Sequence, residues 1–366
     1  MSRASRIARG VALLALAAGA QAAEPLVLAQ SLPLTGAGFT VSNRIVAGAS
    51  AAVDAFNRAG GVGGRTVRLV SVDDAGDAVR HAANLRRLVD EEHPVAFVNC
   101  LGEASCAAAA AVVRATQVAL VGPMSGAPAL RALADAPVHC IRADAALEAV
   151  ALAGQLKSLG VGEVAILGER RGAARTPEIL AEALRRKGLP SFIVRADAAD
   201  MRAALQRVRE ASALVVDLGL DGAEALGQLP PSAFDDGPKV VASLATPGLA
   251  TLMKLFPGRV LGFTAVVPQP ELPNSALVRN LQRDAEALGP EAVTYEGLEA
   301  YVDTLVALEA IRRAGPQANA RGVALEMARL GRLDLGGFAL AFGRAGRGAS
   351  EWVDIGLRAR NGVLLR

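Results

Sequence analysis

The sequence predicts an α/β fold made of two parallel β-sheets, each covered on both faces by helices. Two observations carry this prediction. Short apolar runs typical of strands alternate with amphipathic stretches typical of helices, and the alternation restarts after a break near residues 142–146. Such alternation is typical of parallel sheets that are buried on both faces. A chain of 366 residues also favours two domains over a single core.

The first half of the chain contains four expected strands and three expected helices. The strands are apolar runs at residues 26–30, 67–72, 95–98 and 118–121. The helices lie between them, over residues 42–59, 77–89 and 104–116. In the first helix, Ile45, Ala49 and Val53 recur on one face, and two glycines at 60 and 61 end it. Asp77 is placed to cap the second helix.

The second half of the chain repeats this pattern. Strands are expected at residues 164–167, 192–194, 214–216 and 240–242, and helices over residues 145–159, 177–187, 199–210 and 223–229. Three later helices, at roughly 275–288, 294–313 and 321–330, precede strand-like runs at 338–342 and 352–357. The mixed lengths of these last segments indicate that the chain crosses between the two domains more than once.

The N-terminal residues have the pattern of an export signal. Arginines at positions 3, 6 and 9 precede an apolar run that is too short to span a bilayer, and Ala20 and Ala22 match a cleavage pattern. We therefore expect a signal peptide over residues 1–22 and a mature protein in the periplasm.

Removing that signal leaves a neutral chain. The full sequence has 39 Lys and Arg against 36 Asp and Glu, and three of the arginines belong to the expected signal. A neutral chain gives no electrostatic reason to bind nucleic acid or anionic lipid. Aromatic residues make up only 3% of the chain, which argues against a platform that stacks sugars or nucleobases.

Short motifs rich in glycine and proline punctuate the expected elements. In chain order they are Pro33-Leu-Thr-Gly36, Ala47-Gly48, Phe56-Asn-Arg-Ala-Gly-Gly-Val-Gly-Gly64, Val72-Asp-Asp74, Val121-Gly-Pro123 and Tyr295-Glu-Gly-Leu-Glu-Ala-Tyr301. Together they resemble the Leu/Ile/Val-binding family, the type I periplasmic solute-binding proteins of ABC importers. The resemblance covers nearly all of the chain after the signal.

This resemblance implies two Rossmann-like lobes joined by a hinge with three crossovers, a cleft that closes over a small solute, and no catalysis. It also implies a permease of the inner membrane as partner, and we expect a monomer. The element pattern divides the chain into a first lobe, residues 23–143 plus about 268–335, and a second lobe, residues 144–267 plus about 336–366.

In the family, helix starts and hydroxyl groups of the first lobe hold the carboxylate of the solute. Those positions fall here on Gly102-Glu103-Ala104-Ser105 and on Met124-Ser125-Gly126. Free N–H groups and the helix dipole suit an anion, and Ser105 and Ser125 are candidate hydroxyl donors. The alternative is that Ser105 only caps its helix and that Glu103 points to water.

The sequence departs from the family pattern where an amino acid's ammonium group should bind. The acid of the second lobe falls in Ser243-Leu244-Ala245, which carries no charge. Because an unpaired ammonium in a closed cleft is costly, Glu103 or Asp221 would have to replace that acid. A competing hypothesis is that Arg170 or Arg171 meets the carboxylate of a small organic acid, unless both arginines are solvated surface residues.

Three cysteines and three histidines give no sign of a metal site, because they share no ligand spacing. We expect a disulfide between Cys100 and Cys106, with Cys100–Cys140 or three buried thiols as alternatives. His81 is expected at the surface of its helix.

No cofactor is expected either. Gly36-Ala-Gly38 follows the first strand, but the third glycine of the dinucleotide fingerprint is missing and Asp73 lies too far along the chain. No G-x-S-x-G nucleophile motif occurs. The sequence thus predicts a receptor that binds a small, carboxylate-bearing solute, amino acid-like or an organic acid. A periplasmic ligand sensor with a receptor-domain partner and an exported α/β enzyme are the alternatives.

Overall fold

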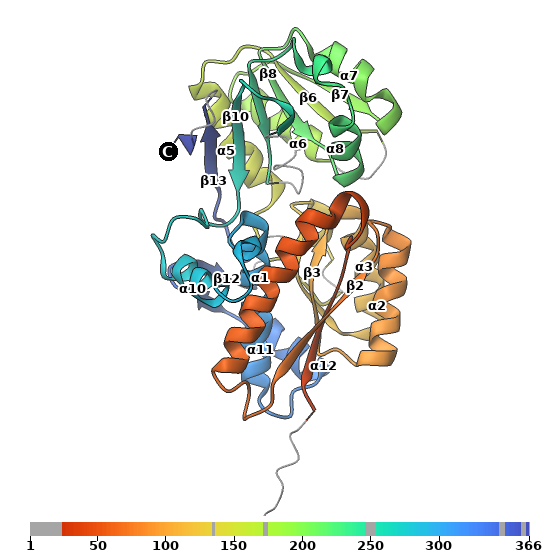
Figure 1. Cartoon of the computed structure of the whole chain (residues 1–366), viewed down its shortest axis with the longest axis vertical. Coiled ribbons are helices and arrows are strands. Elements are labelled where there is room, and N and C mark those ends of the chain that lie inside the picture. Colours follow the sequence, from red (N-terminus) through yellow and green to blue (C-terminus); the bar gives the residue numbers. More distant parts are fainter. Residues whose placement is uncertain are drawn as a thin grey trace, which may run out of the picture.

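A computed structural model describes residues 24–133, 136–170, 175–245, 254–343, 348–359 and 364–365. The expected signal peptide and Arg171 lie outside the described residues. Figure 1 shows two α/β bodies placed end to end, with the first sheet and its helices below and the second sheet above. Within the described residues, no helix is both long enough and apolar enough to cross a membrane.

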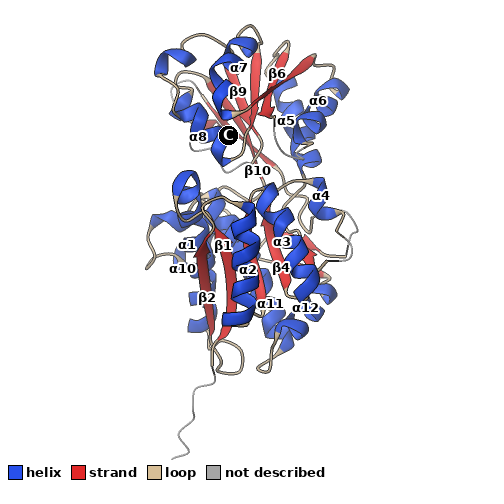
Figure 2. Cartoon of the chain, turned by 90° about the vertical axis from the view of Figure 1, so that its right-hand side faces the viewer, coloured by secondary structure: helices blue, strands red, loops and turns tan. Residues whose placement is uncertain are grey.

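The first sheet is parallel throughout and has the strand order β2-β1-β3-β4-β5. Its strands are β1 (Leu26–Leu32), β2 (Val67–Asp73), β3 (Ala96–Leu101), β4 (Ala119–Met124) and β5 (Val138–His139). One face carries α1 (Phe39–Arg58), α10 (Ala276–Asp284), α11 (Tyr295–Ala314) and α12 (Ala320–Arg329). The other carries α2 (Ala78–Glu92) and α3 (Glu103–Thr116), which Figure 2 shows in front of the sheet.

Alternation along β1 explains why this strand is apolar at nearly every position. Leu26 and Leu28 pack in the cluster that α1 and α11 complete, whereas Val27 and Ala29 pack in the cluster of α2 and α3. A strand that buries both faces has no solvent side on which polar residues would be favoured. The expected covering of this sheet by helices on both faces is confirmed.

The second sheet has the strand order β14-β13-β10-β9-β8-β6-β7. Its strands are β6 (Val164–Glu169), β7 (Ser191–Ala196), β8 (Ala213–Asp217), β9 (Val240–Ser243), β10 (Val260–Ala265), β13 (Asp354–Arg358) and β14 (Leu364–Leu365). One face carries α5 (Ala145–Ser158) and α6 (Thr176–Arg186), and the other carries α7 (Met201–Val208) and α8 (Leu220–Gly227). β13 runs antiparallel to β10, and β14 antiparallel to β13, so this sheet is mixed at one edge.

Shorter elements complete the chain. They are α4 (Pro128–Arg131), the small antiparallel pair β11 (Arg332–Asp334) and β12 (Ala339–Ala341), and the 3₁₀ turns η1 (Gly36–Gly38), η2 (Ala198–Asp200), η3 (Pro231–Phe234) and η4 (Pro290–Ala292).

The chain passes three times between the two sheets: from β5 to α5, from β10 to α10, and from β12 to β13. The last passage comes later than the expected boundary near residue 336. Phe338, Leu340 and Ala349 pack in the core of the first body, because β12 pairs with β11 beside α11. We therefore propose that the last segment of the second lobe begins near Asp354.

Two glycine motifs have a packing explanation. A Cβ atom on Gly48 of α1 would lie 1.9 Å from the carbonyl oxygen of Gly297 in α11, so only glycine lets these helices approach so closely. A Cβ atom on Gly122 would lie 2.0 Å from the carboxyl carbon of Asp303, another α11 residue. The motifs around residues 48, 122 and 297 thus fit α11 against α1 and β4.

The helix cap expected at Asp77 is confirmed, since its carboxylate accepts the Arg80 N–H at 2.6 Å. The surface position expected for His81 is wrong. Its ring is 1% exposed, with Nδ1 2.8 Å from a carboxylate oxygen of Asp74, and the same oxygen accepts the Ser31 hydroxyl. Asp74 therefore gives the imidazole a polar partner inside an otherwise apolar layer.

Candidate functional site

A hollow lies between the two sheets where the chain passes from one to the other. Its cavity volume is about 40 Å³, and it opens into a wider space of about 460 Å³ that includes bulk solvent. The first body contributes Val41 of α1, the ends of β3 and β4 and the start of α11. The second body contributes Ala245 after β9 and the end of β10, and the crossovers contribute Arg142, Val266 and Val267. Leu101, Met124, Val266 and Val267 give it an apolar wall, and Tyr295 lies edge-on to Phe263 across it.

The polar side of this hollow is a buried ion-pair network centred on Arg142. The guanidinium, 6% exposed, lies 3.0 Å from a carboxylate oxygen of Glu148 in α5 and 3.3 Å from one of Glu299 in α11. It also donates to the Ala245 carbonyl at 2.8 Å. Burial alone lowers the pKa of Arg142, but the carboxylates of Glu299 and Glu148 raise it above its usual value.

Glu148 completes the network on the second body. Its other oxygen accepts the Thr264 hydroxyl at 2.6 Å and the Ala245 N–H at 2.8 Å. One crossover residue, Arg142, therefore connects both bodies through its ion pairs with Glu148 of the second and Glu299 of the first. Buried charges of this kind are costly to separate, so the network fixes how the two bodies meet at the hinge.

The start of α3 presents unsatisfied N–H groups, as the sequence predicted for a carboxylate site. Gly102 occupies the cap position with φ of +83° and offers no side-chain cap. The first intrahelical bond is donated by Cys106 to Gly102, so the N–H groups of Glu103, Ala104 and Ser105 have no helical acceptor. By contrast, α2, α5, α10, α11 and α12 are all capped by side chains.

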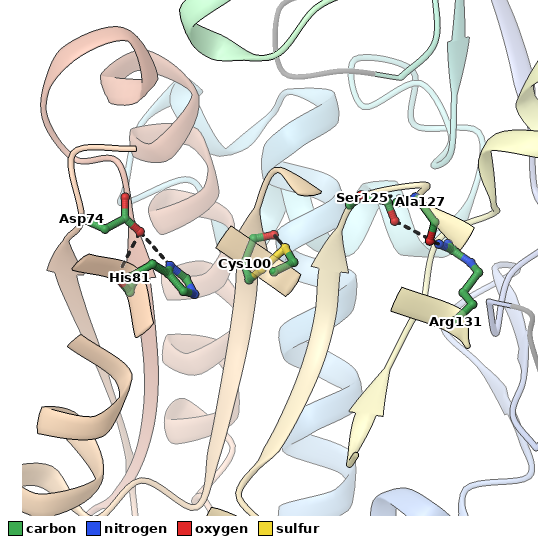
Figure 3. The surroundings of a disulfide bond; sticks show 8 residues. Asp74, His81, Cys100, Ser125, Ala127 and Arg131 are labelled. Atoms are coloured by element: carbon green, nitrogen blue, oxygen red, sulfur yellow. Dashed lines mark hydrogen bonds and ion pairs between the residues drawn. A yellow bond between two sulfur atoms is a disulfide. The ribbon is translucent and has the colours of Figure 1, made fainter. Parts of the chain in front are cut away.

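A disulfide joins Cys100 at the end of β3 to Cys106 in the first turn of α3 (Figure 3). Cys140 is a buried free thiol. Ser105 is 7% exposed and does not cap the helix. The alternative reading of Ser105 as a cap is therefore wrong.

The second predicted loop follows β4. Ser125 N–H donates to Pro123 O at 2.8 Å, and the Ser125 hydroxyl accepts from Ala127 N–H at 3.2 Å. This leaves the Gly126 N–H as the unbonded amide of the loop. Met124 is buried and forms part of the hollow's wall. The side chains of the other predicted residues, as far as the structure describes them, are not part of that wall.

Three acids outside the wall of the hollow come from both bodies. Glu103 is at the start of α3, Glu169 ends β6, and Asp217 ends the neighbouring strand β8. Burial, together with the negative charges of Glu169 and Glu103, raises the pKa of Asp217 to about 7. Burial also raises the pKa of Glu103 and of Glu169, which accepts the Gly219 N–H at 2.9 Å. The acids are thus close enough to repel one another.

The bodies also touch directly near these acids. Leu220, the first residue of α8, packs against a first-body cluster that includes Leu32, Val41 and Met124. A Cβ atom on Gly38 would lie 3.1 Å from the Leu220 methyl carbon Cδ1. The start of α8, which follows β8, therefore packs against η1.

Of the remaining predicted residues, Asp221 lies next to this contact, because it follows Leu220 and its negative charge raises the pKa of Glu169. Arg170 is exposed, with its guanidinium 2.8 Å from Asp200 and 3.6 Å from Asp197. Asp221 is exposed in the first turn of α8. The Leu244 side chain is buried in the cluster of α5 and α6, and the next residue, Ala245, lines the hollow.

Sequence reasoning missed Arg142, Glu148, Glu299 and Asp217. Glu148 and Glu299 lie on helices that read as ordinary amphipathic segments, and Arg142 fell in the expected break between lobes. Asp217 had one available signal, since an acid at the carboxyl end of an apolar strand lies where open α/β sheets bind ligands. In the described part of the chain, no three His, Cys, Asp or Glu side chains converge as a metal site would require.

Comparisons with known proteins agree with this architecture. A family model described as "Periplasmic binding protein" matches residues 25–353. Curated proteins give no match. Among solved structures, a possible leucine/isoleucine/valine-binding protein from Rhodopirellula baltica SH 1 is 21% identical with a TM-score of 0.81, covering 94% of this chain and 97% of its own.

Two further structures hold bound solutes. An ABC transporter substrate-binding protein from Desulfitobacterium hafniense, in complex with Leu, is 15% identical with a TM-score of 0.73 and covers 93% of this chain and 99% of its own. A solute-binding protein of an ABC transporter from R. palustris, in complex with benzoate, is 14% identical with a TM-score of 0.75 and covers 93% and 95%. At these identities the likeness concerns the fold.

Proposed function

The chain belongs to the periplasmic binding protein family, and on this premise we propose that it is the solute-binding component of an ABC importer. It binds a small molecule between its lobes in the periplasm and presents it to a permease of the inner membrane. Binding is reversible and involves no covalent step. The observation that carries this proposal is the hollow between the two sheets, whose walls come from both bodies and from the crossovers.

The proposed solute carries a carboxylate. The free N–H groups at the start of α3 and the Gly126 N–H are donors at the carboxyl edge of the first sheet, where open α/β sheets bind ligands. Partial positive charge at a helix start favours an anion there. The Ser125 hydroxyl, which accepts from Ala127, keeps its own proton to donate.

The same solute also carries an amino group. Glu103 of the first body and Glu169 of the second both act on Asp217, whose pKa is raised because burial and these negative charges disfavour its ionised form. A cationic group placed among them would relieve the repulsion. Of the two arginines that could serve an organic-acid site, Arg170 is already paired with Asp197 and Asp200, and Arg171 lies outside the described residues.

We therefore favour an amino acid-like solute over an amine-free organic acid. Leucine and benzoate, the solutes named for two related structures, share a carboxylate but differ in the amino group.

A thermal-shift screen tests the proposal. The panel contains the standard L-amino acids, dicarboxylates and aromatic acids, and a true receptor gains stability with its solute by mass action. We expect an amino acid to raise the melting temperature most. A largest shift with an amine-free acid would remove the ammonium assignment, and a flat panel would count against the receptor itself.

A further inference from the structure

Arg131, the last residue of α4, makes an unusual set of contacts for a buried cation. Its side chain is 9% exposed, and its two terminal nitrogens donate to four backbone carbonyl groups. Nη1 lies 3.1 Å from the oxygens of Ser125 and Ala127, and Nη2 lies 3.0 Å from that of Arg142 and 3.2 Å from that of Ala143. No carboxylate pairs with it among these contacts.

These four carbonyls belong to two separate segments. Ser125 and Ala127 flank Gly126 in the loop after β4, whereas Arg142 and Ala143 form the first crossover between the bodies. Figure 3 shows the guanidinium beside the loop at the upper end of β4. A further bond joins the same segments, since Ala145 N–H donates to Gly126 O at 3.0 Å. The loop is thereby held to the crossover on both sides of Gly126.

From this geometry we propose that Arg131 is a positioning residue, which ties the amide of Gly126 to the crossover and so couples the solute loop to the hinge. The inference rests on the proposed function, because it assigns a role to a residue that does not touch the solute. A planar guanidinium suits this role, since its donors have a fixed spacing that an ammonium group lacks.

The crossover carries the coupling onward. The Arg142 carbonyl oxygen accepts a hydrogen bond from the Arg131 guanidinium, while the Arg142 side chain pairs with Glu148 of the second body and Glu299 of the first. A shift of the loop on solute binding therefore acts on the residue that joins the two bodies. Each step is a direct hydrogen bond or ion pair between discrete groups.

The test measures backbone amide hydrogen exchange without any solute, so that its outcome does not depend on the proposed function. Variants Arg131→Met and Arg131→Lys are compared with the wild type. The informative amide is Ala145, which donates to Gly126, and the internal control is Leu147, which donates to the Asp144 carboxylate at 2.9 Å in the same helical turn. Leu184→Ala, in the apolar core of the second body, controls for a general loss of stability.

We expect Arg131→Met to speed exchange at Ala145 by about tenfold and to leave Leu147 within about twofold, because only the bond between loop and crossover is released. Arg131→Lys should restore part of the protection at Ala145. Leu184→Ala should change the exchange rates of the Ala145 and Leu147 amides by similar factors. Equal acceleration of both amides in Arg131→Met, or none at Ala145, would overturn the positioning role.

A second arm addresses binding, with the L-amino acid that stabilises the wild type most as the probe. Arg131→Met and Ser125→Ala should weaken its binding in a non-additive way, since both act on one loop, whereas Leu184→Ala and Ser125→Ala should be additive. Additive effects of the first pair would contradict the coupling. Failure of every amino acid to bind the wild type would instead contradict the proposed function and leave the exchange result standing.

Discussion

The disulfide between Cys100 and Cys106 encloses the helix start that is proposed to hold the carboxylate. Their Cα atoms are 5.5 Å apart, and the residues between them are Leu101, Gly102, Glu103, Ala104 and Ser105. The free N–H groups of α3 are therefore fixed covalently to the end of β3. Preorganised donors bind more tightly, because less conformational entropy is lost when the solute arrives.

Removing this disulfide should weaken binding as well as stability. For a double Cys100→Ala, Cys106→Ala variant, the short loop predicts a stability loss of about 2 kcal/mol. We expect the affinity for the best-binding amino acid to fall by about tenfold, since loop ordering then opposes binding. Urea unfolding and calorimetry measure the two effects, with Cys140→Ala as control. Unchanged affinity would show that the disulfide serves stability alone.

Arg142 gives a sharper stability prediction. Arg142→Met should lower the free energy of unfolding by about 3–5 kcal/mol, because it leaves the buried carboxylates of Glu148 and Glu299 without their cation. The matched control is Arg185→Ala, which breaks an exposed pair with Glu182 and should cost less than about 1 kcal/mol. Urea unfolding of both variants measures the difference. Similar losses would mean that the Arg142 network does not fix the hinge.

Asp217 should make the stability of the empty protein fall as pH rises. The unfolded chain loses this proton near the ordinary aspartate pKa of 3.8, whereas the folded chain keeps it until the pH reaches about 7. Between these values the folded state binds more protons, so the free energy of unfolding decreases with pH. Asp217→Asn removes this pH-dependent contribution to the free energy of unfolding.

The variant should therefore be more stable than the wild type, by a margin that grows from pH 4 to pH 8. One unit of pKa shift corresponds to about 1.4 kcal/mol. Urea unfolding across this range measures the margin, and Asp221→Asn, at an exposed acid of α8, is the control. A margin that shrinks with pH would mean that Asp217 is ionised more readily than in the unfolded chain.

The contact between α1 and α11 can be tested with two glycines. Gly48→Ala should destabilise the protein by about 1–3 kcal/mol, because the new methyl group would meet the Gly297 carbonyl. Gly154→Ala in α5 adds the same methyl group where nothing lies within 4 Å, and helix propensity should then stabilise the protein by up to about 1 kcal/mol. Thermal unfolding compares them. Stability changes of the same sign in the two variants would contradict the close approach of α1 to α11.

Much of the fold could be predicted because its signals are local. Strands buried on both faces are apolar at nearly every position, and the helices between them carry one apolar stripe, so the alternation was visible along the chain. β10 was missed although Val260–Ala265 is apolar, since a short apolar run has no period that marks it as a strand. The antiparallel edge was missed because strand direction is decided by the crossovers.

The candidate site could be predicted only where a single segment of the chain forms it. The start of α3 and the loop after β4 follow from strand ends and glycines in single motifs. The convergence of Glu103 with Asp217, and of Arg131 with Arg142, joins positions that no local pattern relates. His81 was misplaced for the same reason, because its partner Asp74 belongs to the segment after β2.

Calorimetric titration with matched solute pairs tests the central claim most directly. Each L-amino acid that stabilises the protein is titrated beside the same molecule without its α-amino group and beside its amide, which lacks the carboxylate. We expect one solute per chain, and a loss of about tenfold or more in affinity when either charged group is removed. Equal binding of the amine-free acid, or no binding by any amino acid, would contradict it.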